Sequence, residues 1–236
     1  MKKTRPGIKI LFSLAATILG LFVFTVPAFA LPYINSSYYC LVDGKSGQVI
    51  VSRQADVMRP VASTTKMMTA ILTVEYANPD EIAIVSQHAG RTPQYSIGLR
   101  ADQKILVSEL LKVALIRSAN DAAVVLAEHV AGDEQFFAHL MSKKAFAIGA
   151  VNTHFRNASG LPATDHYSTA YDLTQIGRYL LNNDYLQSIV ATRQTTFKHP
   201  GYQKPMIIQN TNTLLDTYSG ADGIKTGTTN AAGKCL

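Results

Sequence analysis

Hydrophobic residues are spaced differently in the middle of this 236-residue chain than near its two ends. Strand-like runs at 38–42 and 48–53 flank the turn sequence Asp43–Gly47 and predict a β-hairpin. Similar runs follow near the C-terminus, at 195–198, 206–209 and 223–229. Between these ends, apolar residues recur every three to four positions, which predicts helices. We therefore expect a mixed α/β fold, in which distant terminal strands form one antiparallel sheet and a helical lobe is inserted between them.

Breaks and capping residues divide the helical periodicity into segments. The expected helices are 64–76, 108–117, 121–131, 134–148 and 168–181. The expected loops are 82–100, which carries a short strand at 82–85, and 152–167. The expected domain covers 31–236, as a helical lobe of 61–189 and a sheet lobe of 33–60 and 190–236.

Residues 1–30 have the composition of a secretory signal. A start with four basic residues and no acid is followed by a mostly apolar run at 10–26 and the small-x-small triplet Ala28-Phe29-Ala30. An uncleaved anchor is the alternative, but a membrane span needs about 20 apolar residues. We expect cleavage after Ala30, export of the mature chain, and contact with the membrane only before that cleavage.

Charge and cysteine content exclude several other classes. The net charge of +6 comes mainly from the first 30 residues, and the remainder has 18 basic and 16 acidic residues, so a nucleic-acid partner is not expected. The six histidines lack metal-ligand spacing, and no metal site is predicted. Cys40 and Cys235 could pair in an exported chain, but their apolar surroundings favour small packed thiols.

Three short motifs each occur once: Ser63-x-x-Lys66, Ser118-x-Asn120 and Lys225-Thr226-Gly227. The first two are common by chance, whereas random order would give only about 0.07 copies of the third. The order of the motifs and their structural settings therefore carry the argument.

Ser63 and Lys66 open a predicted helix and share one of its faces. Ser63 could be a simple N-cap, but a capping box would have Glu or Gln where Lys66 stands. The helix N-terminus and burial both lower the pKa of an amine. A serine beside such a base, with backbone N–H groups aimed at an oxyanion, is suited to acyl transfer.

The other two motifs have ordinary interpretations as well. Ser118 and Asn120 lie between two expected helices, where linker and capping residues are common. Gly227 could mark a bulge beside a solvated Lys225. Alternatively, the Lys225 ammonium could bind a carboxylate and help to keep Lys66 neutral by repulsion.

Taken together, these residues resemble the serine D-alanyl-D-alanine carboxypeptidases, the low-molecular-mass penicillin-binding proteins. The resemblance extends through the sequence around each motif and covers about residues 33–236. The matching stretches are 60–70, 115–123, 152–155 with 160–162, and 222–229. It implies a β-lactamase/transpeptidase-like fold and an enzyme that cleaves peptidoglycan stem peptides ending in D-Ala-D-Ala in the extracytoplasmic cell-wall space.

The resemblance also implies catalytic roles. Ser63 attacks the penultimate carbonyl, Lys66 takes its proton, and Ser118 relays a proton to the leaving D-alanine. Water then hydrolyses the acyl-enzyme, without a metal or an organic cofactor. β-Lactams are expected to act as slow acylating inhibitors.

Substrate binding is implied for a second set of residues. Asn120 binds the substrate amide, Lys225 and Thr226 hold the terminal carboxylate, and Gly227 belongs to the same motif. The backbone N–H groups of Ser63 and Thr228 form the oxyanion hole.

Two alternatives remain open at this point. A class A β-lactamase needs a glutamate after the second motif, but no Glu lies between Gln135 and Leu236. Asp165 or Asp172 could be proposed instead, although Asp172 sits in a helical run and favours a structural role. The other alternative is a peptidoglycan-binding remnant, because family members continue beyond the third motif through further strands.

The C-terminus motivates that second alternative. The chain ends nine residues after Gly227, without the later strands and the amphipathic membrane anchor of many family members. We therefore expect an incomplete sheet with unpaired edges, and slow acylation of a chain that ends at Leu236.

Overall fold

The structure is a computed structural model that describes residues 34–236. Residues 37–236 form one compact unit. The expected signal segment, 1–30, lies outside the described residues. Within 34–236, no helix has the length and apolar character that crossing a bilayer requires.

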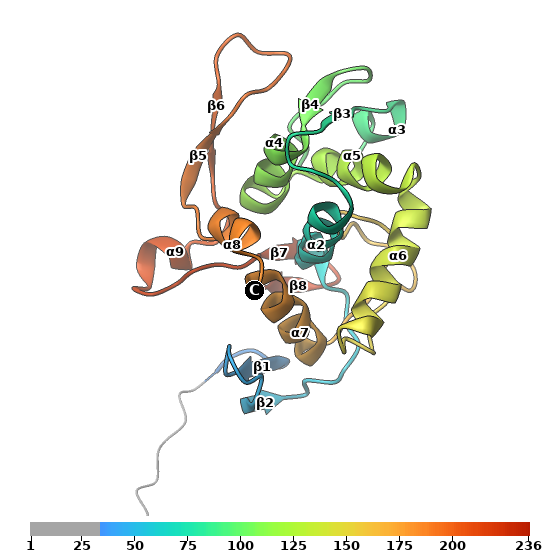
Figure 1. Ribbon diagram of the computed structural model, residues 1–236. Coiled ribbons are helices and arrows are strands. Elements are labelled where there is room, and N and C mark those ends of the chain that lie inside the picture. Colours follow the sequence, from blue (N-terminus) through green and yellow to red (C-terminus); the bar gives the residue numbers. More distant parts are fainter. Residues whose placement is uncertain (1–33) are drawn as a thin grey trace, which may run out of the picture. The chain divides into compact units, whose positions relative to one another are not determined.

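One buried helix forms the centre of the helical layer. Helix α2 (Lys66–Tyr76) follows the short 3-10 helix η1 (Ala62–Thr65) and packs against α5 (Asn120–Ala131), α6 (Glu134–Ala147) and α7 (Ala170–Leu181), as Figure 1 shows. All of residues 66–73 are buried. A helix covered on several sides must be apolar or internally hydrogen-bonded around most of its circumference, which explains its run of Met, Ala, Ile, Leu and Thr.

The expected helix 108–117 is divided in the structure. It consists of α4 (Val107–Lys112) and a π-helical turn, η2 (Val113–Arg117). Ser118 then takes the left-handed conformation, with φ of 68°, and ends the helix. The chain reverses there into α5, so the second motif lies in the bend between two buried helices.

The strands pair locally. Four two-stranded antiparallel sheets are present among the described residues. They are β1 (Tyr39–Val42) with β2 (Val49–Arg53), β3 (Ile82–Ile84) with β4 (Lys104–Leu106), β5 (Gln194–Phe197) with β6 (Met206–Gln209), and β7 (Gly227–Thr229) with β8 (Gly233–Cys235).

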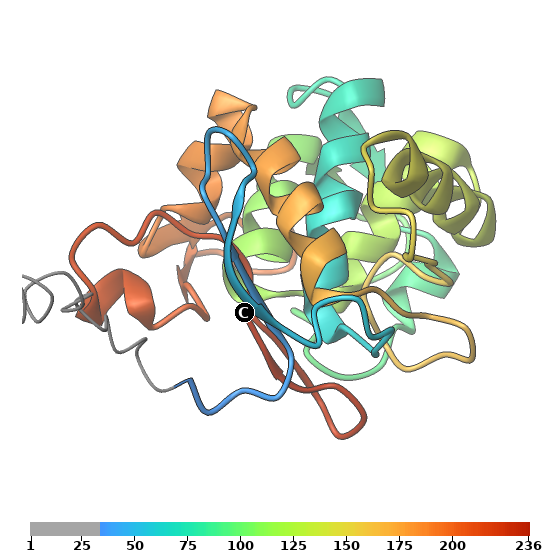
Figure 2. The ribbon, with the colours of Figure 1, turned by 90° about the horizontal axis from the view of Figure 1, so that it is seen from below.

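The mixed fold with antiparallel strands is confirmed, but the single sheet is not formed by the described residues. The ladder bonds of β1 go to β2 and those of β7 go to β8, and no described strand joins the two pairs. Each hairpin packs on a different helical segment, β1 on α7 and β7 on η1. Figure 2 shows the N-terminal hairpin (blue) running alongside α7 (orange).

Several short elements lie where the sequence indicated no helix. They are α3 (Gln87–Gly90), α8 (Asp184–Val190) and α9 (Leu214–Thr217). The strand expected at 223–229 is also shorter than predicted, because only its last three residues pair with β8. Lys225 and Thr226 therefore lie in the extended approach to β7.

Candidate active site

The turn that carries Ser63 is held by its neighbouring threonines. Thr64 Oγ1 donates to Val61 O at 2.6 Å, and Thr65 Oγ1 donates to Ala62 O at 2.7 Å. Ser63 makes no such cap bond: η1 has no side-chain cap, and the half-buried Ser63 hydroxyl lies 3.0 Å from Lys66 Nζ. The N-cap interpretation of Ser63 is therefore not what the structure shows.

Lys66 is buried at the centre of the site, with 1% of its surface exposed. Its Nζ lies 2.7 Å from Asn120 Oδ1 and 2.6 Å from Ser159 O, in addition to Ser63 Oγ. Burial, followed by the charge of Lys225, holds the pKa of Lys66 well below its usual range, while Asp121 raises it.

These contacts suit a neutral amine. A neutral amine has two N–H bonds and one lone pair. The N–H bonds can donate to Asn120 Oδ1 and Ser159 O, the two acceptors that lack a hydrogen of their own. The lone pair then faces the Ser63 hydroxyl, which can donate its proton to it. The geometry and the burial of Lys66 are those required of a base that takes a proton from Ser63.

Ser118, two residues before Asn120, is not hydrogen-bonded to this group. Its backbone is left-handed and its side chain is half-buried. Within residues 34–236, the Ser118 hydroxyl forms no hydrogen bond, whereas Asn120, two residues later, bonds Lys66 directly. The structure thus joins Ser63, Lys66 and Asn120 through hydrogen bonds and leaves the Ser118 hydroxyl available.

The third motif reaches the site from the strand side. A Cβ on Gly227 would lie 2.8 Å from Ser63 N and 3.1 Å from Thr64 N, so only glycine lets β7 pass this close to the nucleophile turn. Thr228, the next residue of β7, is exposed and pairs with Lys234.

Lys225 is buried, yet among residues 34–236 its amine bonds only a backbone oxygen, Thr226 O at 2.8 Å. Burial lowers the pKa of Lys225 to about 7. The Thr226 hydroxyl donates to Thr211 Oγ1 at 2.7 Å. Thr211 was not among the residues that the sequence indicated, and a lone threonine outside a motif offers no signal.

Residues of the 152–167 loop support the nucleophile turn. Gly160 has φ of 83°, and a Cβ there would overlap the carbonyl group of Ala62. Asn157 Oδ1 accepts from Gly160 N at 2.7 Å and from Ser159 N at 3.2 Å, which fixes the carbonyl that faces Lys66. The Gly-Leu-Pro sequence was the signal for this loop, although it did not indicate the Ser159 carbonyl.

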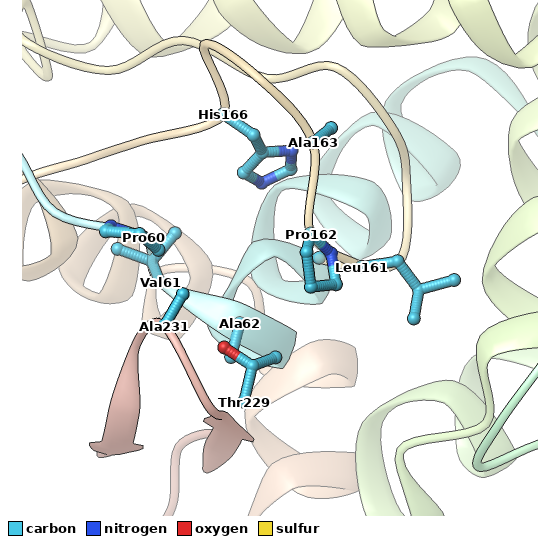
Figure 3. A pocket seen from close by; sticks show the side chains of 10 residues that line it. Pro60, Val61, Ala62, Leu161, Pro162, Ala163, His166, Thr229 and Ala231 are labelled. Atoms are coloured by element: carbon cyan, nitrogen blue, oxygen red, sulfur yellow. The ribbon is translucent and has the colours of Figure 1, made fainter.

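His166 connects the 152–167 loop to the nucleophile turn through Thr65. Its Nδ1 accepts from Arg156 N at 3.2 Å, which assigns the proton to Nε2, and Nε2 lies 2.9 Å from Thr65 Oγ1. Burial, with a smaller effect of His154, lowers the pKa of His166 to about 4. His166 lines a depression together with the nucleophile turn, the Gly160 loop and Thr229 at the end of β7. Figure 3 shows these side chains.

Other candidates have structural surroundings. Asp172 is fully buried, and its Oδ2 accepts from Asn152 N and from the Thr153 hydroxyl, both at 2.7 Å, as expected for a structural role. Cys40 and Cys235 are free and half-buried. No cluster of three or more potential metal ligands occurs in the part of the chain that the structure describes.

A serine hydroxyl 3.0 Å from a buried lysine whose pKa is lowered is the arrangement of serine acyl-transfer enzymes. The chain belongs to the D-alanyl-D-alanine carboxypeptidase family, whose model matches residues 25–236.

Named relatives agree with this assignment. D-alanyl-D-alanine carboxypeptidase DacF of Bacillus subtilis is 34% identical over 201 residues, which cover 83% of this chain and 51% of the relative. DacA of Escherichia coli is 34% identical over 216 residues, covering 86% and 52%. A solved D-alanyl-D-alanine carboxypeptidase from Mycobacterium tuberculosis superposes with a TM-score of 0.82 at 31% identity, covering 88% of this chain and 79% of that one. The chain spans about half the length of the first two relatives.

Proposed function

We propose that residues 31–236 form the catalytic domain of a serine D-alanyl-D-alanine carboxypeptidase that removes the terminal D-alanine from peptidoglycan stem peptides. The proposal rests above all on the Lys66 amine, which is buried between two carbonyl-type acceptors and has its remaining position 3.0 Å from the Ser63 hydroxyl.

In this reaction, Ser63 Oγ attacks the carbonyl carbon of the penultimate D-alanine while its proton passes to Lys66 Nζ. The C–N bond of the tetrahedral intermediate then breaks, and the proton returns through the free Ser118 hydroxyl to the nitrogen of the leaving D-alanine. The product is an ester on Ser63. Water adds to this ester, and cleavage of the C–O bond restores the serine hydroxyl.

The strand side binds the substrate. Lys225 and Thr226 take the terminal carboxylate, and Asn120 takes an amide of the peptide. The backbone N–H groups of Ser63 and Thr228 stabilise the oxyanion, and Gly227 lets the substrate lie close to the nucleophile. A buried ammonium without an acidic side-chain partner supports the carboxylate assignment.

β-Lactams are proposed to acylate Ser63 slowly and to be released slowly. The β-lactamase alternative is less well supported, because no Glu lies between Gln135 and Leu236, Asp172 is bonded within the fold, and Asp165 is exposed. The substrate lies outside the cytoplasmic membrane, so we also propose that 1–30 direct export and are removed after Ala30.

The test is labelling with a fluorescent penicillin, combined with release of D-alanine from a peptide ending in D-Ala-D-Ala. Ser63→Ala should abolish both, whereas Ser188→Ala, on the exposed face of α8, should change neither. Undiminished labelling of Ser63→Ala would overturn the proposal. Rapid penicillin hydrolysis would favour the β-lactamase, and binding of peptidoglycan without acylation would favour the non-catalytic remnant.

A further inference from the structure

Asp121 is a buried carboxylate that is bound by backbone groups alone. It is 1% exposed, lies in the first turn of α5, and forms no ion pair with a side chain of residues 34–236. Its acceptor distances are 3.0 Å to Ile97 N, 3.1 Å to Gly98 N, 3.1 Å to Leu99 N and 2.9 Å to Ala122 N. Charge-assisted bonds of this kind are strong, so the carboxylate ties residues 97–99 firmly to the start of α5.

The adjacent residue, Asn120, bonds the part of the chain that immediately precedes residues 97–99. Asn120 Nδ2 donates to Gln94 O at 3.0 Å, and its backbone N–H donates to Tyr95 O at 3.1 Å. Two consecutive residues of α5 thus hold residues 94–99, which we call the 94–99 segment. The other polar atom of the Asn120 side chain, Oδ1, accepts from Lys66 Nζ.

The 94–99 segment is strained where it meets Asn120. Gln94 and Tyr95 have φ values of 55° and 44°, in the left-handed region that non-glycine residues rarely occupy. Two such residues in succession persist only where surrounding contacts impose the conformation. Here the conformation brings both carbonyl groups to Asn120.

The orientation of the Asn120 amide determines how Lys66 is held. Rotation of the amide by half a turn exchanges its oxygen and its nitrogen. In the observed orientation, the Gln94 carbonyl takes the N–H donor and the oxygen faces the lysine amine. In the opposite orientation, the amide oxygen would face the Gln94 carbonyl, which is repulsive. An amide N–H would face the Lys66 amine and occupy the lone pair that otherwise faces the Ser63 hydroxyl.

We propose that Asp121 and the strained 94–99 segment form a positioning device that fixes the Asn120 amide, and through it the Lys66 amine. The claim that this arrangement affects the acylation rate rests on the proposed function. The claim that it fixes the position and the titration of the Lys66 amine does not. Asp121 and the segment residues are positioning residues, because they touch Asn120 or one another and not the Ser63–Lys66 pair.

A matched pair of substitutions at Tyr95 tests the device. Tyr95→Gly and Tyr95→Val both remove a ring that is 67% exposed, but glycine accepts a φ of 44° and a β-branched residue resists it. The plateau rate of acylation by a fluorescent penicillin should be about tenfold lower in Tyr95→Val than in Tyr95→Gly. Tyr76→Val, which removes a similarly exposed ring at the end of α2, is the control and should acylate like the unaltered protein.

The second readout is the titration of Lys66, followed by NMR with labelled lysine or as the acidic limb of acylation. Tyr95→Val removes no charge. Lys225 and Asp121, the charged groups that act on the pKa of Lys66, are the same in both variants. An amide N–H turned toward the amine disfavours the ammonium. The Lys66 titration should therefore move to lower pH in Tyr95→Val and stay in place in Tyr95→Gly.

Asp121→Asn separates positioning from charge. Loss of the charge alone would move the Lys66 titration to lower pH and leave the acylation plateau unchanged, whereas loss of positioning also lowers the plateau. Equal plateaus and equal titrations of the two Tyr95 variants would overturn the inference, as would an unchanged plateau in Asp121→Asn. If the unaltered protein is not acylated at all, the proposed function fails, and the NMR titration still decides the inference.

Discussion

The helical side and the strand side of the site are held in different ways. On the helical side, Lys66 has partners from three separate parts of the chain, and the threonines of η1 fix the turn that carries Ser63. On the strand side, the Lys225 amine bonds only the carbonyl of the next residue within the described part of the chain, and β7 has three residues. The helical side is complete without substrate, whereas the strand side keeps a buried donor unpaired with any carboxylate.

This difference affects the charge states of the two lysines. Burial without an acidic partner lowers the pKa of Lys225 to about 7, so a substrate carboxylate would restore the charge that burial disfavours. The charge of Lys225 in turn helps to keep Lys66 neutral. Under the proposed function, the charge of Lys225 would help to keep Lys66 ready to accept a proton, and a substrate carboxylate would change the charge state of Lys225.

The largest effect is expected where the helical side is most crowded. Gly160→Ala would place a methyl group on the Ala62 carbonyl and displace the nucleophile turn, with an expected loss of stability of about 3 kcal/mol or more and no measurable acylation. Gly149→Ala is the matched control, because Gly149 has φ of 88° but no atom near the added Cβ. It should lose about 1 kcal/mol by urea denaturation and remain active. Similar behaviour of the two variants would contradict the contact.

The two lysines should differ in the kind of defect that their loss produces. Lys66→Ala removes the base and leaves two buried acceptors without a donor, so the acylation rate should fall by roughly 10²- to 10⁴-fold. Lys225→Ala should weaken carboxylate binding by roughly 10- to 100-fold and affect the maximal rate less. Stopped-flow acylation at several penicillin concentrations separates these parameters. A larger effect on the maximal rate in Lys225→Ala would contradict this division.

How much of this arrangement the sequence predicts depends on the range of the interactions. The long helices and the N-terminal hairpin carry clear periodicity, and the three motifs identify Ser63, Lys66 and Asn120 as partners. The prediction that the terminal strands share one sheet was wrong for the described residues. The pattern of a strand indicates which of its faces is buried, but not which strand pairs with it. Short elements such as α3 and α9 form through tertiary contacts and have no periodicity of their own.

The supporting residues could not be predicted for a different reason. Lys66 bonds the backbone carbonyl of Ser159, and every residue has such a carbonyl, so composition does not mark it. His166 lies 101 residues from Thr65 in sequence, and only the fold brings the two together. The strain at Gln94 and Tyr95 is likewise invisible, because neither residue type favours the left-handed region.

His166 offers a measure of how strongly the helical side depends on its support. Because its pKa is about 4 in the folded chain and about 6.5 when unfolded, the unfolded state binds more protons between these values. The free energy of unfolding should therefore decrease as the pH falls from 6.5 to 4, by up to about 3 kcal/mol. His166→Gln should lack this part of the decrease in urea titrations at pH 7 and pH 4.5. Equal decreases in both proteins would show that His166 is not buried as a neutral ring.

The pH dependence of substrate capture should report on the strand side. Above pH 7, Lys225 loses its charge in the free enzyme, so kcat/KM for a peptide with a free terminal carboxylate should decline there. Lys225→Arg keeps a positive charge and should move this decline to higher pH. A substrate with an amidated C-terminus serves as the control and should not show the decline. A decline that persists in Lys225→Arg would assign it to another group.

The smallest effect is expected from Thr211→Val, which tests whether the strand side is positioned at all. The Thr226 hydroxyl donates to Thr211 Oγ1, and valine keeps the shape of threonine while it removes this acceptor. The loss of one neutral hydrogen bond is worth about 1 kcal/mol, so KM for the carboxylate-bearing peptide should rise by less than about tenfold with little change in kcat. Thr211→Ser keeps the acceptor and should restore KM. If Thr211→Val instead binds substrate more tightly, the bond holds Thr226 away from the carboxylate, and the strand side is completed by the substrate alone.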